Sequence, residues 1–184
     1  MRVHIGGDHA AYDLKCTLVT FLQGKGYDVV DHGPEYFDAQ DDYPVAVLRA
    51  AEAVSGDIGA FGIVLGGSGN GEQMAANKVK RIRAALAYNV ELATLARTHN
   101  NAQILSIGAR MNTQAEAEAM VEAFLTTKFS GDARHARRPG HGRALRATRS
   151  AAAGSGVREL NPARPGLVGN DAKTRAHTLT VNTM

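Results

Sequence analysis

The first 138 residues alternate short apolar runs with longer stretches in which apolar residues recur at helical spacing. The apolar runs are typical of buried strands and cover residues 2–7, 27–33, 60–67, 82–88 and 103–109. The stretches between them predict helices over residues 10–24, 44–55, 70–79, 89–98 and 113–127. Thr113 and Glu116 stand at the two positions of a capping box, which marks the start of the last helix.

Five strands separated by helices predict an α/β fold. Strands that are joined by crossover helices run parallel, and the helices then cover both faces of the sheet. We therefore expect a five-stranded parallel sheet in a Rossmann-like three-layer αβα sandwich, followed by an irregular C-terminal tail.

From Pro139 onward no helical or strand period is sustained, and Gly, Pro, Ala and Arg dominate. The pattern predicts a folded domain over 1–138 and a basic, disordered tail over 139–184. The net charge of +3 comes from this tail, which carries 7 Lys and Arg against 2 Asp and Glu, whereas 1–138 carries 14 against 16. No aromatic residue interleaves with the basic residues of the tail, so we expect no nucleic-acid partner.

Several classes of site are disfavoured by composition. Cys16 is the one cysteine, so the sequence offers neither an internal disulfide nor a cysteine-based zinc site. No pair of histidines has the i, i+4 spacing of a helical metal site, and we expect no metal. The start reads as a strand and a loop rather than a leader, and no apolar run approaches about 18 residues. We therefore expect a cytoplasmic protein with no membrane partner.

Polar side chains follow the predicted strands. In a parallel sheet, ligands bind beyond the carboxyl ends of the strands. The residues expected at that edge are Asp8, His9, Asp41, Asp42, Tyr43, Ser68, Glu72, Tyr88, Asn89 and Arg110. His99 and Asn100 instead close the helix before the fifth strand, which places them at the opposite edge. That position is natural if they serve a neighbouring subunit.

The segment 62–79 carries the most specific chemistry. Its apolar run ends in four closely spaced glycines, and Glu72 follows in the first turn of a helix. Free backbone N–H groups at such a junction form a concavity for a phosphate or an oxyanion. A carboxylate beside this concavity suits proton abstraction next to a carbonyl. The alternative is a tight turn in which Glu72 only interacts with the helix dipole.

With these residues, the chain resembles ribose-5-phosphate isomerase type B, of the sugar-phosphate isomerase family that includes galactose-6-phosphate isomerase. The matching segments are GGDHAAYDLK (6–15), DDYP (41–44), GIVLGGSGNGEQMAANKVKRIRAAL (62–86), ARTHNNAQILSIGAR (96–110) and DARHARR (132–138). The resemblance implies an aldose–ketose isomerase that works through an enediol without a cofactor, as a homodimer or dimer of dimers with shared sites.

The resemblance also implies residue roles. Glu72 would move the proton between C1 and C2, Ser68 would relay protons between the substrate oxygens, and Asp8 and His99 would open the sugar ring. The backbone of Gly67, Gly69, Asn70 and Gly71 would form the anion hole. The residues that would hold the sugar or its phosphate are His9, Tyr43, Asn100, Arg110, Arg134 and Arg138.

Two departures from the family pattern matter. Many members have a cysteine base at the position of Gly66, so this chain resembles the branch that uses a glutamate, and Glu72 carries the proton transfer. The family usually continues past the position of Arg138 into an amphipathic helix. Pro139 and Gly140 are expected to end that helix at once, which weakens the support of Arg138.

The sequence therefore predicts interconversion of ribose 5-phosphate and ribulose 5-phosphate. The first alternative is isomerisation of a hexose 6-phosphate of the allose or galactose type. The second is a nucleotide-binding module. Two features argue against it: the glycine spacing is G-x-G-x-G rather than G-x-G-x-x-G, and the loop follows the third strand rather than the first. The third is a protein that keeps the fold but has lost activity through a weakened dimer.

Overall fold

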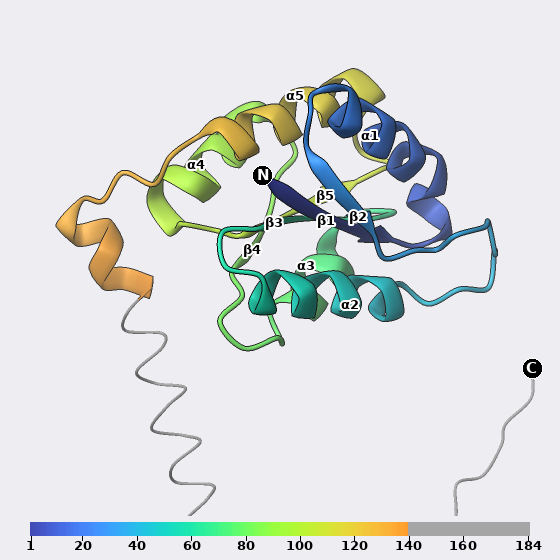
Figure 1. Ribbon diagram of the computed structural model, residues 1–184, viewed down its shortest axis with the longest axis horizontal. Helices are drawn as coiled ribbons and strands as arrows, with labels where there is room; N and C mark the ends of the chain where they lie inside the picture. Colours follow the sequence, from blue (N-terminus) through green and yellow to red (C-terminus); the bar gives the residue numbers. More distant parts are fainter. Residues whose placement is uncertain (140–184) are drawn as a thin grey trace, which may run out of the picture.

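The computed structural model describes residues 1–139, which form a three-layer α/β domain (Figure 1). Its strands are β1 (Arg2–Gly7), β2 (Asp28–Asp31), β3 (Phe61–Gly66), β4 (Ala84–Leu86) and β5 (Ile104–Gly108). Its helices are the short 3-10 helix η1 (His9–Ala11) and α1 (Tyr12–Gly24), α2 (Tyr43–Gly56), α3 (Asn70–Ala76), α4 (Val90–Asn100) and α5 (Gln114–Thr126). The predicted α/β class is confirmed.

All five strands pair in parallel in the order β2-β1-β3-β5-β4. The chain passes from β1 to β2 at one edge and then to β3 on the other side of β1, so the direction of winding reverses between β1 and β3. From β3 it reaches β4 at the far edge and returns to β5, which lies between β3 and β4. The predicted strands 27–33 and 82–88 are longer than the observed β2 and β4. Both are edge strands, and backbone hydrogen bonds to the neighbouring strand continue past their ends, from His32 to Ile5 and from Ala87 to Ser106.

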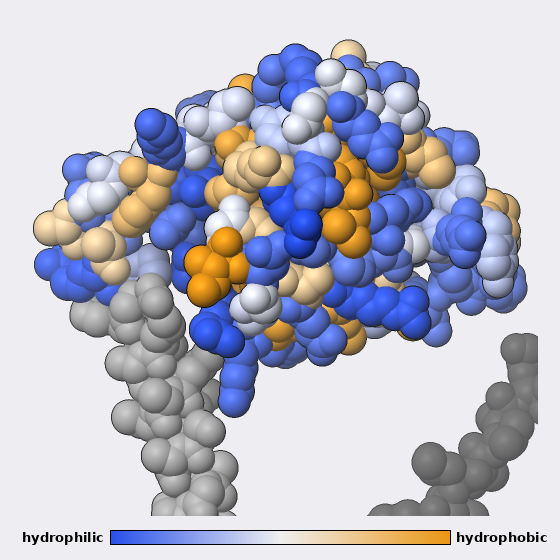
Figure 2. Space-filling model, viewed as in Figure 1, coloured by the Kyte–Doolittle hydropathy of each residue, from blue (hydrophilic) through white to orange (hydrophobic). Residues whose placement is uncertain are grey.

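The helices divide between the two faces of the sheet, as Figure 1 shows. On one face, α1, α4 and α5 bury a large core that includes Leu18, Ile63 and Phe124. On the other face, α2 and α3 cover a smaller core that includes Val47 and Val64. Between these layers, apolar side chains reach the surface in small groups on an otherwise hydrophilic face (Figure 2).

Close approach between α2 and the sheet depends on glycine. A Cβ on Gly6 would lie 2.8 Å from the carbonyl oxygen of Ala46, so a side chain there would push α2 away from β1. This packing fixes the N-terminal end of α2, and hence Tyr43, over the carboxyl ends of β1 and β3. The fold thus brings residues of α2 close to the glycine-rich segment.

Two helix ends can be compared with the ends that the sequence predicted. The capping box is present: the Thr113 hydroxyl accepts from the backbone N–H of Glu116, and the Glu116 carboxylate accepts from the backbone of Thr113. α3 ends at Ala76 rather than 79, because the backbone N–H groups of Lys78 and Val79 donate to carbonyl oxygens three residues earlier, in tighter turns than an α-helix has.

The domain ends in a helical segment, residues 133–139. Pro139 itself is helical, and Gly140, the second residue of the predicted break, lies outside the described residues. The rest of the predicted tail, 140–184, lies outside the described residues. Among the helices of residues 1–139, none is long and apolar enough to cross a membrane.

Candidate active site

The glycine-rich loop connects β3 to α3 and is held against its neighbours. Gly69 has a left-handed backbone with φ of 79°, and a Cβ there would lie 2.7 Å from a methyl carbon of Leu86. The Ser106 hydroxyl donates to the Gly69 carbonyl oxygen at 2.7 Å, and the Tyr88 hydroxyl donates to that of Ser68 at 3.3 Å. These contacts fix the backbone N–H groups of the loop in one arrangement.

Glu72 is buried directly against this loop. Glu72 is only 4% exposed, and its Oε2 has no hydrogen-bond partner among the described residues. A Cβ on Gly66 would overlap the Glu72 carboxylate, so the carboxylate fills the space that a side chain at residue 66 would need. Only glycine at residue 66 leaves room for this carboxylate.

Burial raises the pKa of the Glu72 carboxyl above its ordinary value, because the charged form has lost water. The negative charge of Asp8 adds to this rise, whereas the backbone N–H groups of Glu72 and Gly69 oppose it. A carboxylate with a raised pKa and an unpaired oxygen is a stronger base than one in water. The site therefore holds a carboxylate with the properties of a general base.

Asp8 and His9 follow β1 at the same edge of the sheet. Asp8 is buried and caps η1, accepting from the backbone N–H of Ala10 at 3.0 Å. Burial raises the pKa of the Asp8 carboxyl. His9 is half-buried and contacts Asp41, from the loop after β2.

Three further predicted residues lie around the glycine loop. The Tyr43 ring packs on Gly71, where a Cβ would come within 2.8 Å of the ring. The backbone N–H of Arg110 donates to the Gly67 carbonyl at 3.1 Å, and an Nη of its guanidinium lies 3.6 Å from where a Gly67 Cβ would be. The Ser68 hydroxyl is exposed and accepts at 3.3 Å from the backbone N–H of Asn70. That N–H of the predicted anion hole therefore has a local partner.

The remaining predicted residues lie elsewhere. His99 and Asn100 are the last two residues of α4, which leads into the amino end of β5. Arg134 and Arg138 are exposed on the segment 133–139, which packs beside the end of α4. One chain thus divides the predicted residues into two groups. Those beside the glycine loop are Asp8, His9, Tyr43, Glu72 and Arg110. Those at the opposite edge of the sheet are His99, Asn100, Arg134 and Arg138.

His135 is a residue for which the sequence predicted no role. It is 3% exposed, its ring lies 4.2 Å from that of His99 between centroids, and its Nδ1 lies 2.8 Å from the Ser130 hydroxyl. Burial lowers the pKa of His135, and the neighbouring His99 lowers it further. The buried ring of His135 therefore packs against the ring of His99. No sequence pattern marks it, because the segment 133–139 is too short to show a burial period.

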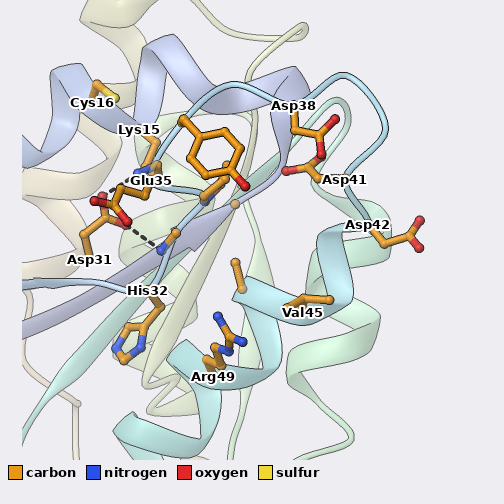
Figure 3. Close-up of a pocket in the computed structure, with 15 residues that line it drawn as sticks. Lys15, Cys16, Asp31, His32, Glu35, Asp38, Asp41, Asp42, Val45 and Arg49 are labelled. Atoms are coloured by element: carbon orange, nitrogen blue, oxygen red, sulfur yellow. Dashed lines mark hydrogen bonds and ion pairs between the residues drawn. The ribbon is translucent and has the colours of Figure 1, made fainter.

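A cavity of about 800 Å³ opens beside the site (Figure 3). It lies between α1, the end of β2, the loop 33–42 and α2, and its polar walls include Lys15, Glu35, Asp38 and Arg49. Lys15 is buried there and pairs with Asp31. Asp41 stands on the loop that forms one wall. The sequence did not predict this cavity. Within residues 1–139, no group of three or more His, Cys, Asp and Glu is arranged to hold a metal ion.

Fold and site together define a class of protein. It is a parallel α/β domain in which a buried carboxylate faces a loop of backbone N–H groups at the centre of the sheet. This arrangement is typical of enzymes that remove a proton next to a carbonyl.

A family model described as Ribose/Galactose Isomerase matches residues 3–141, and the chain belongs to that family. The predicted resemblance is confirmed. The chain is 54% identical over 138 residues to ribose-5-phosphate isomerase B of Mycobacterium tuberculosis, which spans 75% of this chain and 85% of that protein.

Solved structures of ribose-5-phosphate isomerase B have the same fold as this chain. That of Clostridium thermocellum ribose-5-phosphate isomerase B superposes with a TM-score of 0.77 at 40% identity, covering 81% of this chain and 99% of that one. The structure of the Mycoplasma genitalium enzyme with bound ribulose-5-phosphate has a TM-score of 0.74 at 38% identity, covering 80% and 96%.

Proposed function

We propose that this protein is a cofactor-free aldose–ketose isomerase that interconverts ribose 5-phosphate and ribulose 5-phosphate through an enediolate. The observation that carries the proposal is the Glu72 carboxylate, buried on Gly66 beside the glycine loop. Family membership and the ribulose-5-phosphate bound to the Mycoplasma genitalium relative support the substrate. No observation favours a nucleotide-binding module.

In the proposed reaction, Glu72 removes the proton from C2 of the open-chain aldose. The electron pair left behind forms the C1–C2 double bond, and the aldehyde oxygen becomes an oxyanion. Backbone N–H groups of Gly67 to Gly71 stabilise this oxyanion, and one such donor is worth roughly 3 kcal/mol in comparable sites. Glu72 then returns the proton to C1, while Ser68 passes the proton of the C2 hydroxyl to the C1 oxygen.

The other predicted residues complete the proposed cycle. Asp8 and His99 open the sugar ring, since only the open chain has a carbonyl group. His9, Arg110, Arg134 and Arg138 bind the phosphate, for which the arginine fork is suited. Asn100 holds the sugar or the enediolate, and Tyr43 lines the sugar pocket. The proposal includes a cytoplasmic location, because a charged sugar phosphate does not cross a membrane unaided.

The separation of the two residue groups supports a homodimer with shared sites. Glu72 of one chain would work with His99 and Asn100 of a second copy, which a two-fold interface repeats on both sides. Such sharing accounts for functional residues at opposite edges of one domain.

Shared sites predict complementation. Glu72→Gln and His99→Asn should each be nearly inactive alone, but hybrid dimers have one site that carries neither change. Random exchange of the two chains should restore about a quarter of wild-type turnover, because half of the dimers are hybrids with one intact site of two. The measurement is turnover after partial unfolding and refolding of the mixture, with hybrid formation verified by differently tagged chains. Hybrids that remain inactive would contradict shared sites.

Substrate class is tested by ketose absorbance with ribose 5-phosphate and allose 6-phosphate assayed in parallel. We expect turnover of the pentose phosphate, with kcat/KM for the hexose phosphate lower by at least about ten-fold, as a pocket shaped for one fewer carbon allows. Turnover of the hexose phosphate alone would keep the mechanism and replace the substrate. A folded dimer that converts neither would overturn the proposal.

A further inference from the structure

We propose that Asp41 is a positioning residue that pairs with the His9 imidazole and aims it at the substrate phosphate. The inference rests on the proposed function, in which His9 binds phosphate. The sequence placed Asp41 only at the ligand-binding edge of the sheet, and the inference gives it a specific part in substrate binding.

One carboxylate oxygen of Asp41 contacts His9 at two points. Oδ1 of Asp41 accepts from the backbone N–H of His9 at 2.9 Å and lies 2.7 Å from its Nδ1. The two side chains are only partly accessible, at 29% for His9 and 20% for Asp41. The first contact fixes the backbone where β1 passes into η1, and the second fixes the ring. Together they leave the imidazole little freedom to rotate.

The loop that carries Asp41 is itself braced. The Phe37 ring meets the rings of His9 and Tyr12 edge-on, with centroids 6.4 Å and 6.1 Å away. The Tyr12 hydroxyl donates to the Glu35 carbonyl at 3.1 Å, and the backbone N–H of Asp41 donates to the Asp38 carbonyl at 3.1 Å. Figure 3 shows Asp38 and Asp41 close together on the loop above the cavity.

The electrostatic consequence is a raised pKa of the His9 imidazole. The hydrogen bond that the Asp41 carboxylate accepts from the imidazole raises the pKa of His9, partial burial lowers it, and the charges of Asp8 and Asp41 raise it further. These two carboxylates, one from the end of β1 and one from the loop, are the charged groups that act on His9 among the described residues. With Nδ1 used by Asp41, Nε2 carries the remaining N–H for a phosphate oxygen.

The test is Asp41→Asn, with Asp38→Asn as the matched control on the same loop. Asparagine at residue 41 keeps the size but loses the charge, so the His9 pKa measured by NMR should fall toward the ordinary value. KM for ribose 5-phosphate should rise about ten-fold, as loss of a charge-assisted contact allows, with kcat within about two-fold. In the wild type, KM should rise only once the pH exceeds the raised pKa of His9, and in the variant this rise should begin at lower pH. Asp38→Asn should leave all of these values unchanged.

A second comparison separates positioning from mere loop stability. If Asp41 acts through His9, the combination of Asp41→Asn with His9→Asn should raise KM no further than His9→Asn alone. An unchanged His9 pKa, an unchanged KM, or fully additive effects would each overturn the inference. The NMR titration of free protein, and of protein with inorganic phosphate, does not depend on turnover. Failure of the proposed isomerase activity would therefore be seen separately, as a wild type that converts no ribose 5-phosphate.

Discussion

Replacing Glu72 with glutamine should lower kcat by at least ~10², the lower end of general-base contributions, with KM little changed. Glutamine has nearly the shape of glutamate but cannot accept the C2 proton, so the loss falls on the chemical step and leaves substrate binding in place. The measurement is steady-state formation of ribulose 5-phosphate. Near-normal turnover by this variant would remove Glu72 as the base.

Two properties of the same variant serve as controls. The wild-type kcat should fall as the pH drops through the raised pKa of Glu72, because protonation removes the base, and this acidic limb should be absent from any residual activity of Glu72→Gln. The variant should unfold at a temperature no lower than the wild type, since glutamine removes a buried charge whose Oε2 has no partner in residues 1–139.

Gly66→Ala should be nearly as damaging as loss of the base itself. The new Cβ would occupy the space of the Glu72 carboxylate, which must then move away from the reacting carbon. A displacement of about 1 Å costs roughly 10² in rate when it misplaces a reacting group, so we expect a fall of that order in kcat.

The matched control is Gly24→Ala, at the end of α1. A Cβ there meets no atom within 4 Å, and alanine favours a helix over glycine, so activity should be unchanged and stability equal or higher. In the Glu72→Gln background, Gly66→Ala should lower kcat little further, because the two changes disable the same base. Full wild-type activity in Gly66→Ala would show that Glu72 does not act from the observed position.

The fold was predictable because its signals are local. Buried strands such as Ile63–Leu65 read as apolar runs, helices read as periodic stretches, and the crossover rule converts their alternation into a parallel sheet. The lengths of β2 and β4 were overestimated, because pairing at an edge depends on a neighbour that the sequence does not display.

The site was predictable only where it follows strand ends. The strand-end rule brought Asp8, His9 and Glu72 together, and the structure holds them at one edge. The contact between His9 and Asp41 spans 32 residues and depends on the course of the loop 33–42, which no periodicity describes. The stacking of His135 on His99 depends likewise on a turn after α5. The burial of Glu72 over Gly66 depends on the packing of α3 against β3, which the sequence pattern does not display.

The central claim is that Glu72 carries the proton between C2 and C1 through an enediolate. The most direct measurement follows deuterium from D₂O into the C1 and C2 positions of the sugar phosphate by NMR, for the wild type and Glu72→Gln at equal concentration. The account predicts exchange by the wild type, with exchange and isomerisation reduced together by at least ~10² in the variant. A Glu72→Gln protein that exchanges these protons as fast as the wild type would contradict it.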